Sequence, residues 1–220
     1  MINTSDRILQ EKLQNAASDM VRYGRAFYGK GWNLATSSNY SAVVSREPLR
    51  VLMTASGKHK GELTVDDFVL VDQQLSVIEP DGKPSSTAMK PSAEAALHLA
   101  IAKHEGVGAV LHTHSVWGTV LSNRFAADNA VTLSGYEMLK ALAGVKTHET
   151  TIRIPILENS QDMDEVAKIV SRRINSEELK HGFLLRGHGL YTWAESLAAA
   201  RNQVEALEFL FEVVGRSGDL

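Results

Sequence analysis

The stretch "AVLHTHSVWG", residues 109–118, carries an apolar run directly into two histidines, His112 and His114, with only Thr113 between them. Side chains alternate between the two faces of a β-strand, so residues two apart share a face. His112 and His114 are therefore expected to project the same way, about 6 to 7 Å apart along the strand. The pattern predicts a strand that presents two imidazoles on one face.

A metal site explains this pair better than a direct contact, because the expected separation is too long for a hydrogen bond between the rings. Histidine nitrogens bind zinc at about 2.0–2.1 Å, and a catalytic zinc commonly has three protein ligands. The chain has no cysteine, so the third ligand must be His, Asp or Glu. We predict His188, because Gly187 and Gly189 flank it and allow a tight turn. Two ordinary strand histidines on a polar face remain the alternative, and iron or nickel would also suit three imidazoles.

Composition limits the classes of partner. The 220 residues are 44% hydrophobic with a net charge of -3, which suits one domain over residues 1–220 and argues against a nucleic-acid partner. The absence of cysteine excludes disulfides and thiolate metal sites. No apolar run is long enough to span a membrane, and the first 20 residues do not look like a secretory signal. We therefore expect a cytoplasmic protein.

Periodicity predicts a mixed α/β chain. Apolar residues at helical spacing predict an opening helix over 5–28, and a second helix is expected to begin near Pro91. Ser160 is expected to cap a third helix, and Thr192 with Glu195 has the spacing of a capping box before the last. Between the helices, β-type runs occur in "SAVVS", "RVLMT", "FVLVD", "LSVIE", "VGAVLHTH", "TTIRIPIL" and "GFLLRGHGLYTW". These elements predict one sheet covered by helices.

Several ordered motifs resemble those of the class II aldolase/adducin family. They are "GWNLATSSNYS", "TASGKHKGELTVDDFVLVD", "KPSAEAALHLAIAKH", "AVLHTHS", "SGYEMLKAL" and "RGHGLYTWAESLAAA". The resemblance implies a single three-layer α/β/α domain around a mixed, largely antiparallel sheet. It also implies one zinc ion per subunit, held by His112, His114 and His188. The implied assembly is a homotetramer with active sites between subunits.

Within the family, the chain is most similar to the dehydratases that remove water from a methylthio-substituted ketose phosphate in methionine salvage. The resemblance thus implies an enzyme, a hydro-lyase with a small sugar-phosphate substrate. A class II sugar-phosphate aldolase or epimerase with the same metal is the alternative. A second alternative is a binding module like adducin; such relatives lack the metal ligands, whereas all three histidines are present here.

Two carboxylates compete for the acid/base role that this chemistry needs. Glu137 lies in "SGYEMLKAL", a segment similar to the one that holds the acid/base glutamate of the dehydratases. Glu94 lies in "KPSAE", similar to the stretch whose glutamate serves the aldolases. We favour Glu137 and keep Glu94 as the alternative. Without the resemblance, each would be interpreted as an ordinary carboxylate on a helix.

The phosphate of such a substrate needs hydrogen-bond donors. The resemblance places it against a set of small polar residues: Ser38, Asn39, Ser56, Gly57 and Ser92. Ser38 stands where the aldolases usually have glycine, and Ala93 stands where they have a second serine. Lys58, Lys60 and Lys90 are nearby in the sequence; assistance to the phosphate is one role open to them, and a solvated face is the favoured interpretation.

Overall fold

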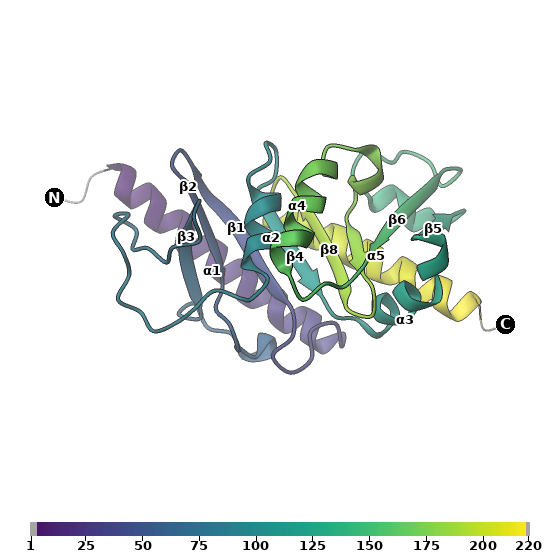
Figure 1. Ribbon diagram of the computed structural model, residues 1–220, viewed down its shortest axis with the longest axis horizontal. Coiled ribbons are helices and arrows are strands. Elements are labelled where there is room, and N and C mark those ends of the chain that lie inside the picture. Colours follow the sequence, from purple (N-terminus) through teal and green to yellow (C-terminus); the bar gives the residue numbers. More distant parts are fainter. Residues whose placement is uncertain (1–3, 219–220) are drawn as a thin grey trace.

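An eight-stranded mixed sheet forms the centre of the computed structural model, which describes residues 4–218 (Figure 1). The order across the sheet is β3-β2-β1-β4-β8-β7-β6-β5, and every neighbouring pair is antiparallel except β6 and β7. The strands are β1 (Asn39–Arg46), β2 (Leu49–Thr54), β3 (Phe68–Asp72), β4 (Ala109–Thr113), β5 (Ala130–Ser134), β6 (Thr151–Leu157), β7 (Phe183–Leu185) and β8 (Gly189–Ala194).

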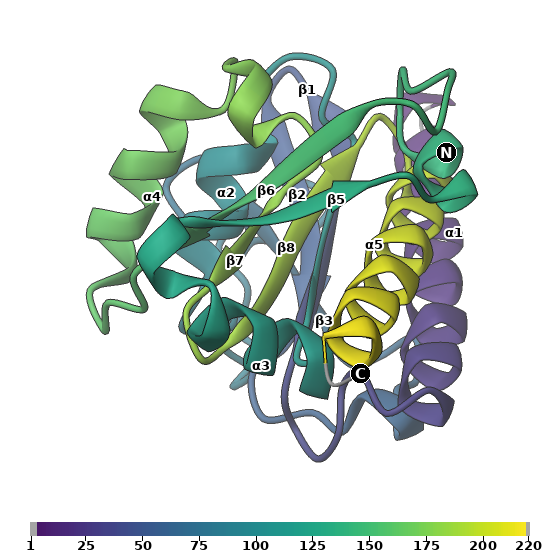
Figure 2. The ribbon, with the colours of Figure 1, turned by 90° about the vertical axis from the view of Figure 1, so that its right-hand side faces the viewer.

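Helices cover both faces of this sheet (Figure 2). The helices α1 (Thr4–Gly29) and α5 (Leu197–Ser217) lie on one face, and α2 (Ala95–Ala102) and α4 (Met163–Arg173) lie on the other. A further helix, α3 (Val116–Arg124), follows β4 and packs against α5. Short 3-10 turns are η1 (Lys60–Glu62), η2 (Ala126–Asp128), η3 (Glu137–Ala141) and η4 (Glu177–Leu179). The predicted three-layer α/β/α fold, with its mixed and largely antiparallel sheet, is confirmed. Within residues 4–218, no helix combines the length and apolarity that crossing a membrane requires.

The strand β4 lies in the middle of the sheet, and all five of its residues are buried. Leu111 packs into the core beneath α1 and α5, whereas Val110 packs into the core beneath α2 and α4. This alternation continues to the end of the strand, so His112 shares the α2/α4 face and Thr113 shares the α1/α5 face. Burial on both faces explains why the run before the histidines is continuously apolar.

Helix boundaries differ from the sequence prediction at three places. The second helix begins at Ala95 rather than near Pro91, because Pro91 forms an isolated bridge with Ala55 and remains extended. Asp162 rather than Ser160 caps α4, accepting hydrogen bonds from two backbone N–H groups. At the last helix the expected capping box is wrong.

The cap of α5 is Ser196, whose side chain accepts a hydrogen bond from Ala199 N. Thr192 instead lies in β8, paired with Leu111. The run "LSVIE" forms only isolated bridges, and α3 and β5 had not been predicted. At Pro91 and Thr192 the backbone pairs with another strand instead of starting or capping a helix, so the strand pairing decides where the helix begins.

Candidate metal centre

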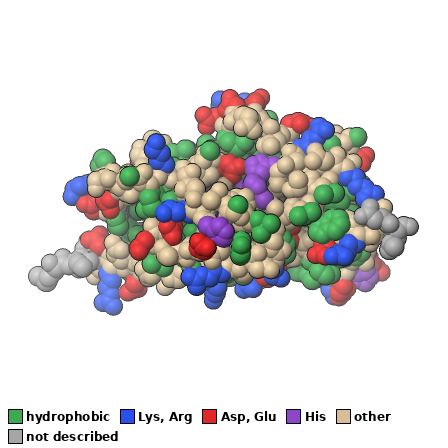
Figure 3. Space-filling view, turned by 90° about the horizontal axis from the view of Figure 1, so that it is seen from below, with side chains coloured by type: hydrophobic (Ala, Val, Ile, Leu, Met, Phe, Trp, Pro, Cys, Tyr) green, Lys and Arg blue, Asp and Glu red, His purple; other side chains and the backbone are tan. Residues whose placement is uncertain are grey.

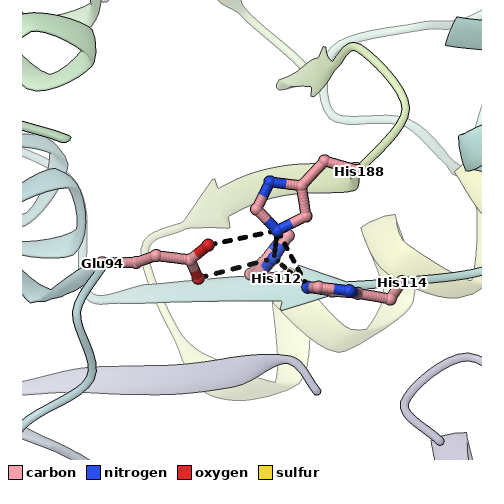
Figure 4. Close-up of side chains that lie close together, drawn as sticks. All are labelled: Glu94, His112, His114 and His188. Atoms are coloured by element: carbon pink, nitrogen blue, oxygen red, sulfur yellow. Dashed lines mark hydrogen bonds and ion pairs between the residues drawn. The ribbon is translucent and has the colours of Figure 1, made fainter. Parts of the chain in front are cut away.

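Three histidines that are distant in the sequence meet at one point (Figure 4). His112 is on β4, His114 follows the end of that strand, and His188 lies in the turn between β7 and β8. Because β4 and β8 are paired neighbours, the turn before β8 brings His188 over the face on which His112 and His114 lie. Pairing of central strands therefore assembles the cluster from the two predicted segments.

The three Nε2 atoms face one another. They are separated by 2.7 Å (His112 to His114), 3.1 Å (His114 to His188) and 3.3 Å (His112 to His188). A tetrahedral ion with nitrogen ligands at about 2.0–2.1 Å places them roughly 3.3 Å apart. The spacing of the imidazoles therefore fits a single small divalent cation.

The other ring nitrogens have partners that fix the orientation of two rings. His112 Nδ1 donates to the carbonyl oxygen of Leu190 at 2.8 Å, and His188 Nδ1 lies 3.2 Å from Oδ1 of Asn159. A proton held on Nδ1 leaves the Nε2 lone pair free, which is the tautomer that a metal-binding histidine needs. Tyr191 adds a stacked ring, whose centroid is 3.9 Å from that of His112.

Burial favours the neutral form of His112 and His114. It holds the pKa of His112 well below its ordinary value, because a charged ring would be desolvated there. Burial, with the neighbouring charge of His188, also lowers the pKa of His114 to about 4. Neutral imidazole is the form that binds metal, so the site is ready for a cation at physiological pH.

Glu94 is the fourth member of the cluster (Figure 4). Its carboxylate oxygens lie 3.1 Å from His188 Nε2 and 3.6 Å from His112 Nε2, and Asn39 Nδ2 donates to it at 2.5 Å. Burial would raise the pKa of Glu94, but the hydrogen bond with His188, the electrostatic effect of the His112 ring and the hydrogen bond from Asn39 together hold it well below its ordinary value. Glu94 is thus an ionised carboxylate beside the three nitrogens.

A cavity of about 780 Å³ opens onto this cluster. Figure 3 shows histidine side chains (purple) with acidic side chains (red) beside them near the middle of one face of the molecule. Besides Glu94, His114 and His188, the lining residues are Ala93, Ala96, Thr119, Asn159, Gln161, Asp162, Met163, Asp164 and Gly187. The volume is that of an ordinary small-molecule site.

Comparison with known proteins agrees with this architecture. The model of the class II aldolase and adducin N-terminal domain matches residues 18–214. The chain belongs to the class II aldolase/adducin family. This assignment confirms the family resemblance of the sequence motifs.

Curated relatives in the family share a name. The methylthioribulose-1-phosphate dehydratase of Pseudomonas aeruginosa (strain UCBPP-PA14) is 45% identical over 205 residues, covering 93% of this chain and 95% of the relative. The enzyme of that name from Azotobacter vinelandii is 46% identical over 194 residues, covering 88% and 89%.

Solved structures from the family give the same fold. YgbL from Escherichia coli, described as a putative aldolase/epimerase/decarboxylase, superposes with a TM-score of 0.75 at 25% identity, covering 94% of this chain and 91% of that chain. L-fuculose-1-phosphate aldolase from Thermus thermophilus gives a TM-score of 0.71 at 21% identity, covering 94% of each chain. The second likeness supports the fold alone.

Glu137, the favoured acid/base of the family resemblance, lies away from the cluster within one chain. It begins η3, just beyond the edge strand β5, and its exposed side chain pairs with Lys140 and His148. In the sheet order β5 is four places from β4, about 19 Å at ordinary strand spacing. The structure thus brings Glu94, but not Glu137, to the histidines of the same chain.

Two of the predicted phosphate-contact residues adjoin the cluster directly. Asn39 donates to both Glu94 and Ser92. Ser38 is buried with φ at 70°, the left-handed region that favours the glycine usual in the aldolases. Ser56 and Gly57 are exposed on the next loop, where Ser56 N donates to Lys90 O at 2.8 Å.

Sequence reasoning missed several residues of the site. Asn159 orients His188 and lines the cavity, and no motif around it pointed to this role. The solvated position expected for Lys60 is wrong, because this residue is only 2% exposed. A lysine among turn residues looks alike in sequence whether its loop is free or packed, as here, against α1.

Proposed function

We propose that this chain is a zinc-dependent methylthioribulose-1-phosphate dehydratase. The reaction converts 5-methylthioribulose 1-phosphate to 2,3-diketo-5-methylthiopentyl 1-phosphate and water, a step of methionine salvage in the cytoplasm. The observation that carries the proposal is the convergence of His112, His114 and His188, with Glu94, on a cavity of substrate size. Relatives of that name at 45% identity over nearly the whole chain select this activity among those of the family.

The three imidazoles would hold one zinc ion per subunit. When bound there, the ion supplies a Lewis acid that polarises the C2 carbonyl and stabilises the negative charge which develops as the C3 proton leaves. Iron or nickel would suit the same three nitrogens, and zinc is the divalent ion that we propose. Burial lowers the pKa of His112 and of His114, so these two rings are available to a cation without first having to lose protons.

Proton transfer falls to a carboxylate. It takes the proton from C3 and returns a proton to the C4 hydroxyl, which departs as water, and the resulting enol becomes the diketone. We propose Glu137 of a neighbouring subunit for this role. Its exposed position at the edge of the sheet suits a site completed between copies of the chain, as the family resemblance implies.

Glu94 is the alternative acid/base. It lies within 3.6 Å of two of the imidazole nitrogens, close enough either to ligate the metal or to reach a bound substrate. If Glu137 transfers the protons, Glu94 keeps its ionised carboxylate beside the metal and stabilises the cation by charge. The two assignments predict different dead variants, which are set out in the Discussion.

Small polar residues are proposed to bind the phosphate. This set lies on three loops and at the start of β1, at one end of the sheet: Ser38, Asn39, Ser56, Gly57 and Ser92. The side chain of Asn39 joins the set to Glu94. A phosphate bound there would direct the remainder of the substrate past the metal toward the cavity. Backbone N–H groups of such loops are natural donors to an anion.

The function is tested by supplying the zinc-loaded protein with 5-methylthioribulose 1-phosphate and following the products by mass spectrometry. We expect one water to be lost per substrate molecule. Release of dihydroxyacetone phosphate or glycolaldehyde phosphate from a sugar phosphate, without water loss from 5-methylthioribulose 1-phosphate, would assign the chain to the aldolases instead. A protein that stays folded but binds no metal and turns over neither substrate would be a binding module.

A further inference from the structure

Lys60 is a buried cation whose ammonium group contacts the backbone of two loops that carry proposed phosphate contacts. It is the first residue of η1 and is 2% exposed. The turn packs closely on α1, because a Cβ added at Gly24 would overlap the Lys60 carbonyl and one added at Gly61 would overlap the Tyr28 ring. Glycine at these two positions lets η1 lie against the helix and fixes where the lysine enters the interior.

Among the described residues, the partners of the ammonium group are carbonyl oxygens rather than carboxylates. Lys60 Nζ donates to the carbonyl oxygens of Lys58 at 2.7 Å and Thr36 at 3.3 Å, and within residues 4–218 no carboxylate lies within 4.0 Å of it. Burial lowers the pKa of Lys60 to about 8, with the charge of Glu94 opposing this effect. A buried charge that is compensated only at longer range is costly to the fold. An ammonium has three donors, and two of them are used here.

Two loops contact this charge, and a third loop is joined to them. Thr36 precedes Ser38 by two residues, and Lys58 follows Gly57 directly. Lys60 thus joins the loop before β1 to the loop after β2. The third loop joins through the pairing of Ala55 with Pro91 and the hydrogen bond from Asn39 to Ser92.

The conformation of these loops suits an anion. Ser38 and Gly57 have φ of 70° and 72°, and left-handed residues in such loops turn successive N–H groups into one concavity. The loops therefore combine backbone donors with a buried positive charge that no carboxylate contacts directly within residues 4–218.

We propose that Lys60 supplies the positive charge of the phosphate site, joining the loop before β1 to the loop after β2 and donating its remaining N–H to the substrate's phosphate. This inference rests on the proposed function for the identity of the substrate, but not for the class of ligand, which is a phosphate monoester or phosphate itself. A phosphate dianion there compensates the buried ammonium, so binding is strengthened by both charge and hydrogen bonding.

The test compares three variants of the zinc-loaded protein. Lys60→Met removes the charge and keeps the length of the side chain, Lys60→Gln removes the charge but keeps hydrogen-bond donors, and Lys90→Met removes an exposed lysine from the same region. The affinity for inorganic phosphate is measured by calorimetry, together with zinc content and thermal unfolding. Both Lys60 variants should weaken phosphate binding by about tenfold or more, while Lys90→Met should stay within about twofold of the wild type.

The controls separate this site from the metal. Zinc content should be unchanged in every variant, so a phosphate bound only to the metal would survive the loss of Lys60. Wild-type phosphate affinity in folded Lys60→Gln, or no measurable phosphate binding by the wild type at millimolar concentration, would overturn the proposal. Failure of the proposed function looks different: the wild type would bind phosphate through Lys60 but would not dehydrate 5-methylthioribulose 1-phosphate.

Discussion

A hydrogen bond between Thr113 and Glu208 links β4, the strand that carries His112, to α5. The Thr113 hydroxyl donates to Glu208 Oε1 at 2.5 Å, on the face of β4 opposite His112 and His114. Glu208 is on α5 and is 2% exposed. Helix α5 therefore contacts Thr113, the residue that separates the two histidines. The position of α5 is thus linked to the geometry of the histidine cluster.

Glu208 should make the stability of the fold depend on pH. Burial raises the pKa of its carboxyl from 4.5 to about 7, although hydrogen bonds with Ser115 and Thr113 oppose the shift. The folded state thus favours the protonated acid, and this stability is complete below pH 4.5 and is lost as pH rises to 7. Relative to Glu208→Gln, which cannot ionise, the wild type should lose up to about 3 kcal/mol of unfolding free energy over that interval.

Denaturant titrations at constant zinc from pH 4.5 to 8 measure this difference directly, since the histidines titrate in both proteins and cancel. Glu205→Gln removes a partly exposed carboxylate from the same helix and should not reproduce the fall. A difference between the wild type and Glu208→Gln that does not change with pH would contradict the buried-acid interpretation.

Gly189 should tolerate no side chain. It begins β8 directly after His188, and an added Cβ would overlap the carbonyl oxygen of Thr113 on the paired strand. Gly189→Ala should lower the unfolding free energy by about 2 kcal/mol or more and weaken zinc binding, since it displaces the turn that carries His188. Gly29→Ala is the matched control, because nothing lies within 4 Å of its Cβ position. Equal unfolding free energies of Gly189→Ala and Gly29→Ala would contradict the expected overlap between a Cβ at position 189 and the Thr113 carbonyl oxygen.

Loss of a ligand should remove metal without unfolding the protein. His114→Ala should lower zinc affinity more than about 100-fold, and Asn159→Ala, which only loses the partner of His188 Nδ1, should lower it by about 10- to 100-fold. Competition with a chromogenic chelator gives both affinities. His104→Ala, outside the cluster, serves as the control. Unchanged zinc affinity in His114→Ala would remove this histidine from the ligand set.

The two candidate carboxylates can be told apart by mixing subunits. Glu137→Gln should keep zinc and fold while its turnover collapses. If Glu137 acts on a neighbouring subunit, exchanging subunits between Glu137→Gln and His114→Ala should restore part of the activity, because some sites then combine an intact metal with an intact glutamate. No recovery after proven exchange, together with an inactive Glu94→Gln that retains zinc, would assign the proton transfers to Glu94.

The histidine cluster could be predicted from the sequence because its pattern is local. The alternation around Thr113 and the glycines around His188 each occupy a few residues, and strand pairing then brings the two segments together. Helix and strand periodicity predicted one sheet covered by helices, and the resemblance of the motifs to the family implied the three-layer arrangement. Helix starts were predicted less well: Pro91 and Thr192 have acceptable local chemistry for helix starts, but strand or bridge partners claim both.

Burial of charged groups was beyond the sequence. Lys60 and Glu208 look like solvated residues in their local context, and only packing against α1 and β4 encloses them. The same limit applies to Glu137, whose proposed place in a site depends on a second copy of the chain rather than on its own neighbours.

The most direct test of the central claim is a zinc titration of chelator-stripped protein with 5-methylthioribulose 1-phosphate as substrate. The account predicts that water loss from the substrate rises with added zinc and saturates at one ion per chain. Full turnover by the stripped protein, or a saturated metal site that releases no water from this substrate, would contradict it.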